Sequence, residues 1–324
     1  MSSLFLAIDG GNSKTDVVLA DTGGTVHGHA RGPGSSPHHL GLAGSIELLD
    51  ELVGKAVGGQ ALPVERVELF LAGADLPAEV AALTKAVTAR GWARHCAVDN
   101  DTFALLRAGV ESAGTGAVAV VCGAGINCVG RTGDGRSVRF PSLGEITGDW
   151  GGGHHLAQLA LWHAARGEDG RGPATALTAA VAAHFGRATV EDVGIGIHLG
   201  EIPPRRVDEL TRVLFAVAAG DAVAQRVLDE QADEIVAYVR VAVTRLDLAT
   251  TALPVVLGGG VLRGGWDQLG PRITAGVTAV APRARLTFVD DPPVVGAALS
   301  ALDALGAPES AYPVLRAAVR EAAA

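Results

Sequence analysis

The sequence predicts an α/β protein made of two related lobes with a cleft between them. The chain opens with LFLAIDGGNSKTDVVLA, in which a β-rich apolar run ends in a turn of glycine and hydroxylic residues before a second strand. The same plan returns in AVAVVCGAGINCVGR, which begins at Ala117. Segments with helix and strand character alternate after each unit. A duplication at this long period indicates two lobes, and the cleft between two lobes is a natural place for a ligand.

The first half of the chain is expected to form a mixed sheet with helices on both faces. We expect strands at residues 4–8, 16–20, 25–31, 67–72 and 95–98, and helices at residues 39–57, 77–90 and 100–110. Three strands followed by alternating helices and strands are typical of a mixed sheet that is covered on both sides. The segment GVESAGTG then provides a small and polar hinge. The first lobe is therefore assigned to residues 1–112.

The second half repeats this plan around a long helical region. Expected strands cover residues 117–122, 126–131, 137–140, 254–260 and 284–290, and the final helices cover residues 294–305 and 311–323. A helical region is expected at residues 151–246, and glycine or proline interrupts it at 167–173, 186 and 203–204. The second lobe is therefore assigned to residues 113–324, and the last helix is expected to pack on the first lobe.

Composition narrows the class of protein. With 324 residues and 48% hydrophobic residues, the chain is long enough for two packed cores. Its net charge of −9 argues against a sequence-independent nucleic-acid binder, which needs clustered Lys and Arg. No apolar stretch approaches the ~20 residues needed to cross a bilayer, and no basic leader precedes the first strand. We therefore expect a cytoplasmic protein without a nucleic-acid or membrane partner.

The three cysteines are expected to be buried thiols. Cys122 and Cys128 lie on the strands that flank the second glycine turn, and Cys96 lies on the short strand expected at residues 95–98. Thiols at such positions pack as small hydrophobic groups. The chain has no CxxC, HExxH or zinc-like spacing of His and Cys, so we expect no structural metal.

The first glycine turn, from Asp9 to Thr15, has the composition of a phosphate-binding loop. Glycines let the backbone approach a phosphate, and main-chain N–H groups with Ser or Thr hydroxyls can surround its oxygens. Asp9 could orient Mg²⁺ through water, or it could only cap its own turn. The sequence GxxxxGK[ST] is absent, so this is not a Walker A loop. Two such loops gripping one polyphosphate predict a nucleotide-dependent phosphotransferase.

A second candidate segment is HCAVDNDTFALL, where a short strand gives way to a helix. Each of Asp99, Asn100 and Asp101 could be the N-cap of that helix. A carboxylate at a strand end beside a cleft could equally be the general base for a hydroxyl nucleophile. Spacing alone does not choose between Asp99 and Asp101.

The segment LGEITGDWGGGHHLAQLALW places an acidic, glycine-rich loop in front of a helix. Asp149 could accept hydrogen bonds from sugar hydroxyls, and the helix N-terminus behind the loop favours anions. The pattern favours a capping or packing role for His154 and His155. His38 and His39 follow GPGSSP in a loop that runs into a helix, and that loop could reach a substrate.

A third glycine turn, LGGGVL at residues 257–262, lies between a strand and a helix. Its glycines would let a flat ligand such as adenine lie against the backbone, or they would only serve tight packing. The three turns, in this order and at these separations, resemble the actin-like superfamily of sugar kinases. That resemblance covers essentially the whole chain. It implies two ribonuclease-H-like lobes that close around ATP and a sugar.

More narrowly, the chain is similar to the N-acetylglucosamine kinase branch, which is grouped with the BadF/BadG-type ATPases. The matching strings are DGGNSKT, VDND, GAGIN, GEITGDWGGG, LGGGVL and PPVVGAAL. The resemblance implies Mg²⁺-dependent transfer of phosphate from ATP to the C6 hydroxyl of N-acetylglucosamine by a homodimer. It also makes Asp101 the catalytic base, which spacing had left open.

The resemblance assigns further roles residue by residue. ATP would be bound by Gly10, Gly11, Asn12, Ser13, Lys14, Thr15, Gly123, Ala124, Gly125, Asn127, Gly258, Gly259 and Gly260. The sugar would be bound by Ser36, His38, Asp101, Leu143, Gly144 and Asp149, and Mg²⁺ would lie near Asp9. Three positions depart from the branch. Ser36 stands where an asparagine is usual, Ala124 replaces the threonine of GTGSN, and GDEGS reads GDWGG.

These departures keep other substrates and another class of protein open. Glucosamine, glucose and N-acetylmuramic acid are alternative substrates, because one methyl or acetyl contact contributes only ~1–3 kcal/mol to discrimination. A BadF-type activator ATPase, which drives electrons into 2-hydroxyacyl-CoA dehydratases or benzoyl-CoA reductases, needs cysteines placed to hold an iron–sulfur cluster between two subunits. The cysteines here fall on or beside expected core strands. A non-catalytic sensor is disfavoured because the candidate base Asp101 is present.

Overall fold

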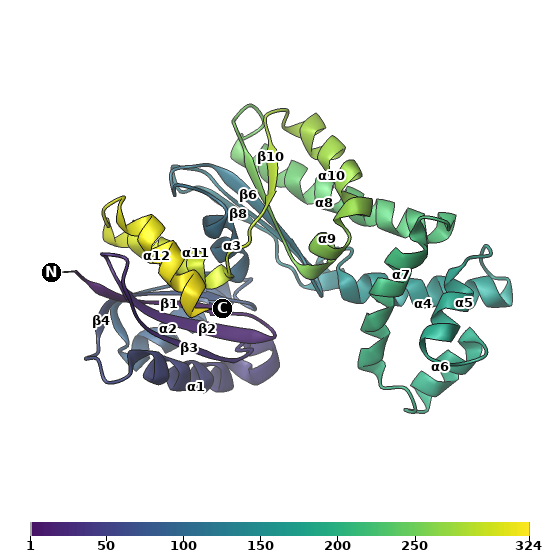
Figure 1. The fold of residues 1–324 in the computed structure, drawn as a ribbon, viewed down its shortest axis with the longest axis horizontal. Helices are drawn as coiled ribbons and strands as arrows, with labels where there is room; N and C mark the ends of the chain where they lie inside the picture. Colours follow the sequence, from purple (N-terminus) through teal and green to yellow (C-terminus); the bar gives the residue numbers. More distant parts are fainter. Residues whose placement is uncertain (1, 324) are drawn as a thin grey trace.

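The computed structural model describes residues 2–323 and contains two five-stranded sheets (Figure 1). The first sheet consists of β1 (Leu4–Gly10), β2 (Lys14–Asp21), β3 (Val26–Pro33), β4 (Val64–Leu71) and β5 (Ala93–Asn100). The second consists of β6 (Ala117–Cys122), β7 (Ile126–Arg131), β8 (Ser137–Arg139), β9 (Pro254–Gly258) and β10 (Arg285–Phe288).

The two sheets have the same topology. The first has the order β3-β2-β1-β4-β5, and the second has the equivalent order β8-β7-β6-β9-β10. In each sheet the first three strands pair in antiparallel fashion, and the other two run parallel to the first strand. The expected α/β fold with two related lobes is therefore confirmed.

Helices cover both faces of the first sheet. One face carries α1 (Pro37–Val57) and α2 (Pro77–Arg90), and the other carries α3 (Asp101–Ala108), α11 (Pro293–Leu305) and α12 (Ala311–Ala322). Because successive strand residues point to opposite faces, Leu6 and Ile8 of β1 pack in the core with α1. Phe5 and Ala7 pack in the core with α11 and α12.

The first lobe is built from both ends of the chain. The chain crosses between the lobes at residues 109–116 and again at residues 289–292. Both α11 and α12, drawn in yellow in Figure 1, lie against the first sheet; this packing was expected for α12, the last helix, but not for α11. Their apolar faces cover the side of the sheet that α1 and α2 leave open.

Helix α3 lies between the two sheets. Its buried residues share one core with Phe5 and Phe70 of the first sheet and with Ala119 and Val256 of the second. The first residue of α3 is Asp101, so the fold places this carboxylate where the lobes meet.

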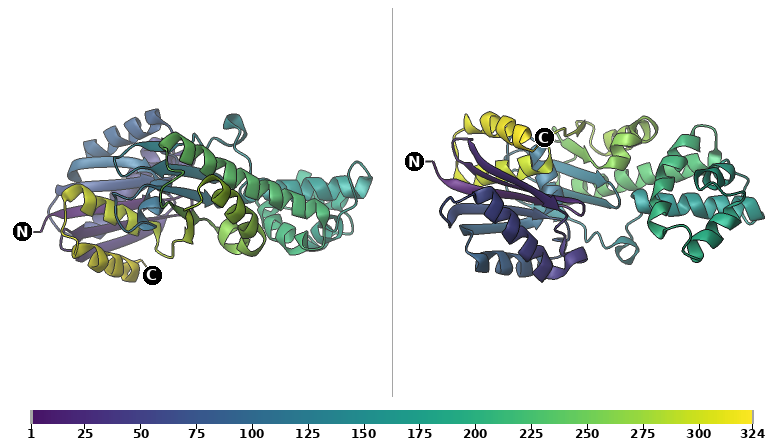
Figure 2. Two further views of the ribbon diagram at one scale, coloured as in Figure 1. Left: turned by 90° about the horizontal axis from the view of Figure 1, so that it is seen from above. Right: turned by 60° about the horizontal axis from the view of Figure 1, so that its bottom comes forward.

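The second lobe carries a long helical extension. The outer face of its sheet is covered by α8 (Ala222–Leu246) and α10 (Trp266–Val280), with the short α9 (Gly260–Gly264) after β9. The extension contains α4 (Gly153–Asp169), α5 (Leu177–His184), α6 (Val190–His198), η2 (Pro204–Glu209) and α7 (Leu210–Ala218), and a short turn η1 (Gly144–Thr147) precedes it. Figures 1 and 2 show it pointing away from the first lobe. The expected helical region is confirmed, with breaks at the glycines and prolines named above.

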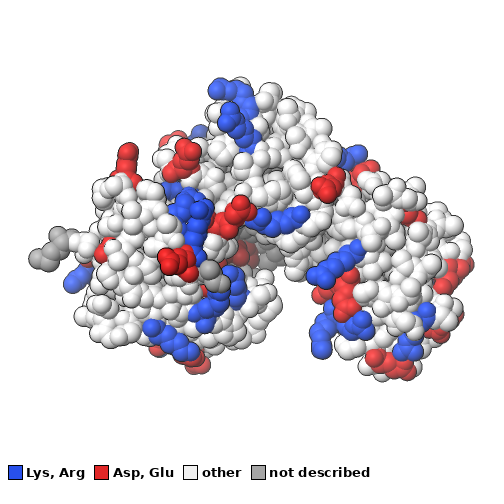
Figure 3. All heavy atoms as spheres, in the orientation of Figure 1, with Lys and Arg blue, Asp and Glu red and all other residues white. Residues whose placement is uncertain are grey.

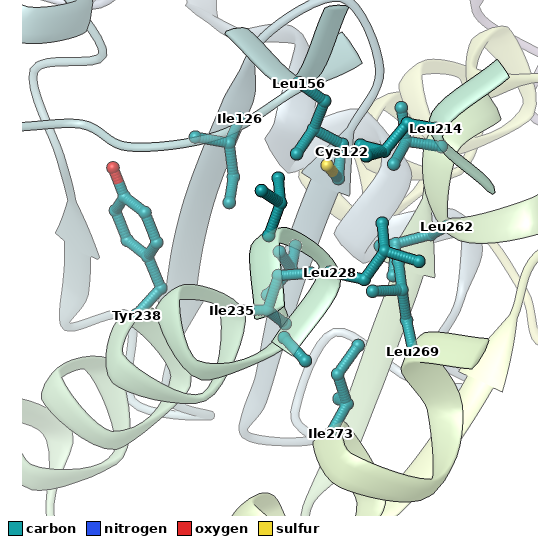
Figure 4. Packing of buried hydrophobic residues seen from close by; sticks show 14 of the residues in the cluster. Cys122, Ile126, Leu156, Leu214, Leu228, Ile235, Tyr238, Leu262, Leu269 and Ile273 are labelled. Atoms are coloured by element: carbon teal, nitrogen blue, oxygen red, sulfur yellow. The ribbon is translucent and has the colours of Figure 1, made fainter. Parts of the chain in front are cut away.

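The core of the second lobe contains two of the cysteines. Cys122 and Cys128 are fully buried, and Figure 4 shows Cys122 among Leu156 of α4 and Leu214 of α7. Burial raises the pKa of Cys122 to about 12, so this thiol stays protonated at neutral pH. The expectation of buried thiols is confirmed for these two, whereas Cys96 on β5 is only half-buried against the core of the first lobe.

Ion pairs connect the lobes on the side of β5 away from the glycine turns. Arg131 Nη2 lies 3.1 Å from one carboxylate oxygen of Asp99, and Arg139 Nη2 lies 2.5 Å from the other. Both guanidinium groups also stack over the ring of Phe103, at 4.4 and 5.2 Å from its centroid. Asp99 of the first lobe is thereby joined to β7 and β8 of the second.

The surface view adds two observations. On the face drawn in Figure 3, acidic and basic side chains are interspersed, and a hollow separates the first lobe from the helical extension. Within residues 2–323, no helix combines the length and the apolar composition needed to cross a membrane.

Candidate active site

The three glycine turns line three adjoining cavities, two of them between the lobes and one within the second lobe. A central cavity of about 280 Å³ is lined by the first and third turns, and a polar cavity of about 230 Å³ is lined by the second turn. Asn12, Asp101 and Val121 line both of these cavities. A wide cavity of about 800 Å³ shares Gly123 and Ala124 with the polar cavity. The three cavities therefore form one continuous site.

The first turn is shaped by close backbone packing. The N–H group of Gly11 donates to the Lys14 carbonyl at 2.9 Å, which closes the turn. A Cβ atom at Gly10 would lie 2.3 Å from the end of the Leu71 side chain, so a larger residue there would have to displace Leu71 of β4. Gly10 thus lies behind the turn. The residues of the turn that line the central cavity are Asp9, Gly11, Asn12, Ser13 and Lys14.

The second turn is held between two glycines with positive φ angles. Gly152 has a φ of 83°, and a Cβ atom there would lie 2.6 Å from the backbone of Gly125. Gly259 has a φ of 94°, and a Cβ atom there would lie 2.2 Å from the carbonyl oxygen of Cys122. The first two N–H groups of α4 also donate to carbonyls of the turn at 2.7 and 3.0 Å. These contacts fix the turn between α4 and the third glycine turn.

Asp101 lies on the boundary between the central and polar cavities. Its helix is capped by Asn100, whose side-chain oxygen accepts from the Thr102 N–H at 2.9 Å. Burial raises the pKa of Asp101 to about 6, although hydrogen bonds from Thr102 oppose this shift. A carboxylate with a pKa just below neutral is suited to accept a proton from a hydroxyl group. Asp99 lines none of the three cavities and is paired with arginines instead.

Asp9 lines the central cavity and is 5% exposed. Burial, with repulsion from Asp101 and Asp16, raises the pKa of Asp9 well above its ordinary value, while Lys14 opposes the shift. A buried carboxylate that faces a second carboxylate favours a hard divalent cation beside it. The residues present therefore fit the expected Mg²⁺ near Asp9.

The polar cavity is lined by groups that can hydrogen-bond a polyhydroxylated ligand. These groups are Asn12, His38, Asp75, Asn100, Asp101, Asn127 and Ser142. Among residues 2–323, the buried hydroxyls of Ser142 and Ser36 have no hydrogen-bond partner. Ser36 lies behind the wall at Gly73, where a Cβ atom would be 3.2 Å from its hydroxyl oxygen. Unpaired buried hydroxyls next to a cavity are suited to take partners from a ligand.

The wide cavity lies between the helical extension and the third turn. It is lined by Gly123, Ala124, Gly153, His154, Asp208, Thr211, Arg212, Phe215, Ala216, Gly260, Val261, Gly264, Gly265 and Gln268. His154 pairs with Asp208 at 2.7 Å, and the amide of Gln268 donates to the Phe215 carbonyl at 2.9 Å. The cavity is large and partly apolar, so it can hold a nucleoside next to the phosphate-sized central cavity.

Several residues expected in the site lie elsewhere in the structure. The hydroxyl of Thr15 is buried; it donates to the Pro33 carbonyl and accepts from the Ser35 hydroxyl, each at 2.8 Å. Leu143, Gly144 and Asp149 belong to the loop before α4 and line none of the three cavities. The Asp149 carboxylate instead accepts hydrogen bonds from Tyr238, Thr147 and Gly144 at 2.6, 2.7 and 3.0 Å.

The two histidines before α4 differ in their contacts. The ring Nδ1 of His155 accepts from the Gly151 N–H at 3.1 Å, which is the expected capping role. His154 lines the wide cavity. The sequence-based reading also missed Asp75, Asn100 and the residues of α7 and α10 that line the cavities. Asp75 and the residues of α7 and α10 belong to no recognisable sequence motif. Asn100 could have been identified, because it lies in the string VDND.

Comparisons with known proteins place this site in a family. A sequence profile of the BadF/BadG/BcrA/BcrD ATPase family matches residues 6–301. An N-acetylmuramic acid/N-acetylglucosamine kinase of Clostridium acetobutylicum is 28% identical over 79% of this chain and 85% of its own length. An N-acetyl-D-glucosamine kinase of Dictyostelium discoideum is 25% identical over 93% of this chain and 98% of its own length.

Solved structures share the fold over nearly the whole chain. A provisionally assigned N-acetylglucosamine kinase of Chromobacterium violaceum gives a TM-score of 0.67 at 21% identity, covering 92% of this chain and 98% of its own. A ROK family glucokinase of Streptomyces griseus, solved with glucose and AMPPNP, gives 0.56 at 18% identity, covering 92% of this chain and 98% of its own. The matched architecture is that of sugar kinases with the actin-like ATPase fold. By its sequence match over residues 6–301, the chain belongs to the BadF/BadG/BcrA/BcrD ATPase family.

Proposed function

We propose that the protein is an ATP-dependent kinase that phosphorylates the C6 hydroxyl of an amino sugar, with N-acetylglucosamine as its substrate. The observation that carries this proposal is the position of Asp101. Its carboxylate lies between a cavity built from glycine turns and a cavity lined by amides, carboxylates and the unpaired hydroxyl of Ser142. A base at that boundary can contact a sugar hydroxyl on one side and the terminal phosphate of ATP on the other.

In this proposal Asp101 accepts the proton of the C6 hydroxyl as that oxygen attacks the γ-phosphorus. The new O–P bond forms while the bond between the γ-phosphorus and the bridging oxygen breaks, and ADP leaves. The N–H groups of the turns and Lys14 would stabilise the charge on the transferred group. Asp9 would hold Mg²⁺, which supplies charge neutralisation when bound. The wide cavity would hold the adenosine.

The choice of N-acetylglucosamine is supported by the two curated relatives, both of which are named for that substrate. The Clostridium relative is also named for N-acetylmuramic acid, so this sugar is the first alternative. Glucosamine and glucose are further alternatives. We also propose that the active form is a homodimer, which light scattering would test.

The activator ATPase is the second candidate class, and the cysteines argue against it. A cluster shared between two subunits needs thiolates at the protein surface. Cys122 and Cys128 are fully buried within the second lobe, and Cys96 lies on β5 of the other lobe. This arrangement supports a kinase.

A coupled assay of ADP release with Mg-ATP tests the proposal. The panel contains N-acetylglucosamine, N-acetylmuramic acid, glucosamine, glucose, N-acetylmannosamine and a blank without sugar. We expect N-acetylglucosamine to give the highest kcat/KM and the blank to give almost no ADP. Rapid ADP release in the blank, together with coloured purified protein, would favour the activator ATPase. No release with any sugar would contradict the kinase proposal.

A further inference from the structure

Asp75 is a buried carboxylate that the proposed reaction has not yet used. It lies in the loop between β4 and α2, lines the polar cavity and is 8% exposed. Its backbone is held in place because Glu79 Oε2 accepts from the N–H groups of Asp75 and Leu76 at 3.0 and 2.8 Å. The position of its side chain is therefore well defined.

Asp75 contacts Asn100, the N-cap residue of α3, whose first residue is the candidate base Asp101. The side-chain N–H of Asn100 donates to Asp75 Oδ1 at 2.8 Å. The side-chain oxygen of the same Asn100 accepts from the Thr102 N–H at 2.9 Å and from Asn127 Nδ2 at 3.3 Å. Asn100 thereby joins three elements: the loop before α2, the start of α3 beside Asp101, and β7 of the second lobe.

Asp75 and the Thr102 N–H fix the orientation of the Asn100 amide from its two ends. An ionised carboxylate only accepts hydrogen bonds, so the NH₂ group of Asn100 must face Asp75. The oxygen of Asn100 must then face Thr102 and Asn127. A neutral asparagine at position 75 could present either its oxygen or its NH₂ group, so the orientation of Asn100 would then be fixed by the Thr102 N–H alone.

The charge at position 75 lowers the stability of the protein. The titratable and charged groups that face Asp75 are Asp101 from α3, Glu79 from α2, His38 from α1 and Arg139 from β8. Burial, with repulsion from Asp101 and Glu79, raises the pKa of Asp75 to about 7, while His38 and Arg139 oppose the shift. An amide could make the same hydrogen bond without this cost. Strongly shifted groups of this kind gather at functional sites.

We propose that Asp75 is a positioning residue for phosphoryl transfer, because it holds Asn100 in the orientation that sets the start of α3 and ties Asp101 to Asn127 of the second lobe. This inference rests on the proposed kinase function. It assigns Asp75 to the alignment of the base rather than to sugar binding.

Steady-state kinetics with Mg-ATP and the sugar that the wild type prefers test this role. We expect Asp75→Ala to lower kcat by about 10- to 100-fold, because small displacements of reacting groups have effects of that size. The KM values for sugar and ATP should change much less than kcat. Asp75→Asn keeps a hydrogen-bond acceptor, so it should recover part of the lost kcat. Glu51→Gln, which removes an exposed carboxylate paired with Lys55, is the matched control and should behave as wild type.

A double-mutant cycle with Asn100→Ala separates action through Asn100 from direct contact with the sugar. If Asp75 acts through Asn100, the double variant loses little more kcat than Asn100→Ala alone. Losses that multiply, or a sugar KM that rises while kcat is kept, would overturn the inference. A wild type that phosphorylates no sugar would instead refute the proposed function, so the two failures are distinguishable.

The pH profile gives a readout that remains useful if Asp75→Ala does not fold. In the wild type, protonation of both Asp75 and Asp101 should steepen the fall of kcat/KM below pH 7. Asp75→Asn should leave a shallower acid limb, because only Asp101 then titrates in this range. The ionisation of ATP affects both enzymes equally. Identical acid limbs in the two proteins would overturn the inference.

Discussion

At the scale of single residues, the pKa values of the carboxylates around the first turn depend on whether hydrogen-bond donors contact them. Asp9 and Asp16 face each other across β1 and β2, and both are buried. Burial would raise the pKa of Asp16, but hydrogen bonds from Arg31, His29 and Lys14 outweigh it and hold the pKa below its ordinary value. Asp9 has no such donors, and its pKa is raised. A cation that joins the site would therefore act on Asp9 rather than on Asp16.

Asp149 gives a prediction at the same scale. Its carboxylate organises the loop before α4 through Tyr238, Thr147 and Gly144. Figure 4 shows the hydroxyl of Tyr238 pointing away from the buried cluster, toward this loop. We expect Asp149→Ala to lower the free energy of unfolding by roughly 1.5–3 kcal/mol, because hydrogen bonds to charged groups contribute on that order. The KM for sugar should rise more than the KM for ATP, because the same loop carries Ser142 of the polar cavity. Tyr238→Phe removes one donor and should have a smaller effect. An unchanged free energy of unfolding in Asp149→Ala, measured by urea unfolding, would show that these three hydrogen bonds do not hold the loop in place.

At the scale of secondary-structure elements, the junction of β9 and α9 packs against the backbone of the second turn and fixes its position. Gly259 has a positive φ and no room for a Cβ atom, whereas the neighbouring Gly260 has nothing within 4 Å of its Cβ position. We expect Gly259→Ala to lower the free energy of unfolding by about 1–3 kcal/mol, because backbone strain has costs of that order. Gly260→Ala is the matched control and should leave stability nearly unchanged or slightly higher. Urea unfolding measures both variants, and equal stabilities would show that the close contact at Gly259 can relax.

Most elements could be predicted from the sequence because their signals are local. The strands that flank each glycine turn, the hinge and the breaks in the helical region all depend on neighbouring residues. The position of Asp101 at the start of α3 depends on its place in VDND, which the resemblance to sugar kinases assigned. Its location between the sheets depends on the packing of α3, which the sequence does not state directly.

The features of the fold and of the site that the sequence did not predict depend on contacts between segments that lie far apart along the chain. Phe215 of α7 and Gln268 of α10 meet at the wide cavity although 53 residues separate them along the chain. Asp75 and Asn100 meet across the parallel strands β4 and β5. The return of α11 to the first sheet could not be predicted either, because a buried amphipathic face does not specify which sheet it covers. The carboxylate of Asp149 was expected to contact sugar, and its three protein donors became visible only in the structure.

At the scale of the whole molecule, the two crossings and α3 define how the lobes are connected. Arg107 of α3 makes two hydrogen bonds to Asp303 of α11, at 2.6 and 3.0 Å. Arg131 and Arg139 connect the second lobe to Asp99, two residues before the candidate base. These ion pairs, with the stacking of both guanidinium groups over Phe103, therefore hold β7 and β8 of the second lobe against α3.

Stability as a function of pH is a property of the whole molecule. Asp9, Asp75 and Asp101 all have pKa values raised from the ordinary 3.8, to about 7 for Asp75 and about 6 for Asp101. The folded state therefore binds more protons than the unfolded state between about pH 4 and 7, so stability falls as the pH rises through this window. We expect the free protein to unfold at a lower temperature at pH 8 than at pH 6.

Asp75→Asn removes one of these groups. The free energy of unfolding should therefore differ less between pH 6 and pH 8 in this variant than in the wild type. The change should be on the order of 1–3 kcal/mol, since one pKa unit corresponds to about 1.4 kcal/mol. Calorimetry at pH 6 and pH 8 measures both proteins, with Glu51→Gln as the control. A melting temperature that rises from pH 6 to pH 8 would contradict the pKa shifts of these buried carboxylates.

The most direct test of the central claim is to identify the product and compare its rate of formation in wild type and Asp101→Asn. The protein is incubated with Mg-ATP and N-acetylglucosamine, and phosphorus–proton coupling in the NMR spectrum locates the new phosphate ester. We expect N-acetylglucosamine 6-phosphate from the wild type. Asp101→Asn should form it about 10²- to 10⁴-fold more slowly, as loss of a general base predicts, while still binding ADP. A phosphate ester at another hydroxyl, ATP hydrolysis without any phosphosugar, or equal rates in the two proteins would contradict this account.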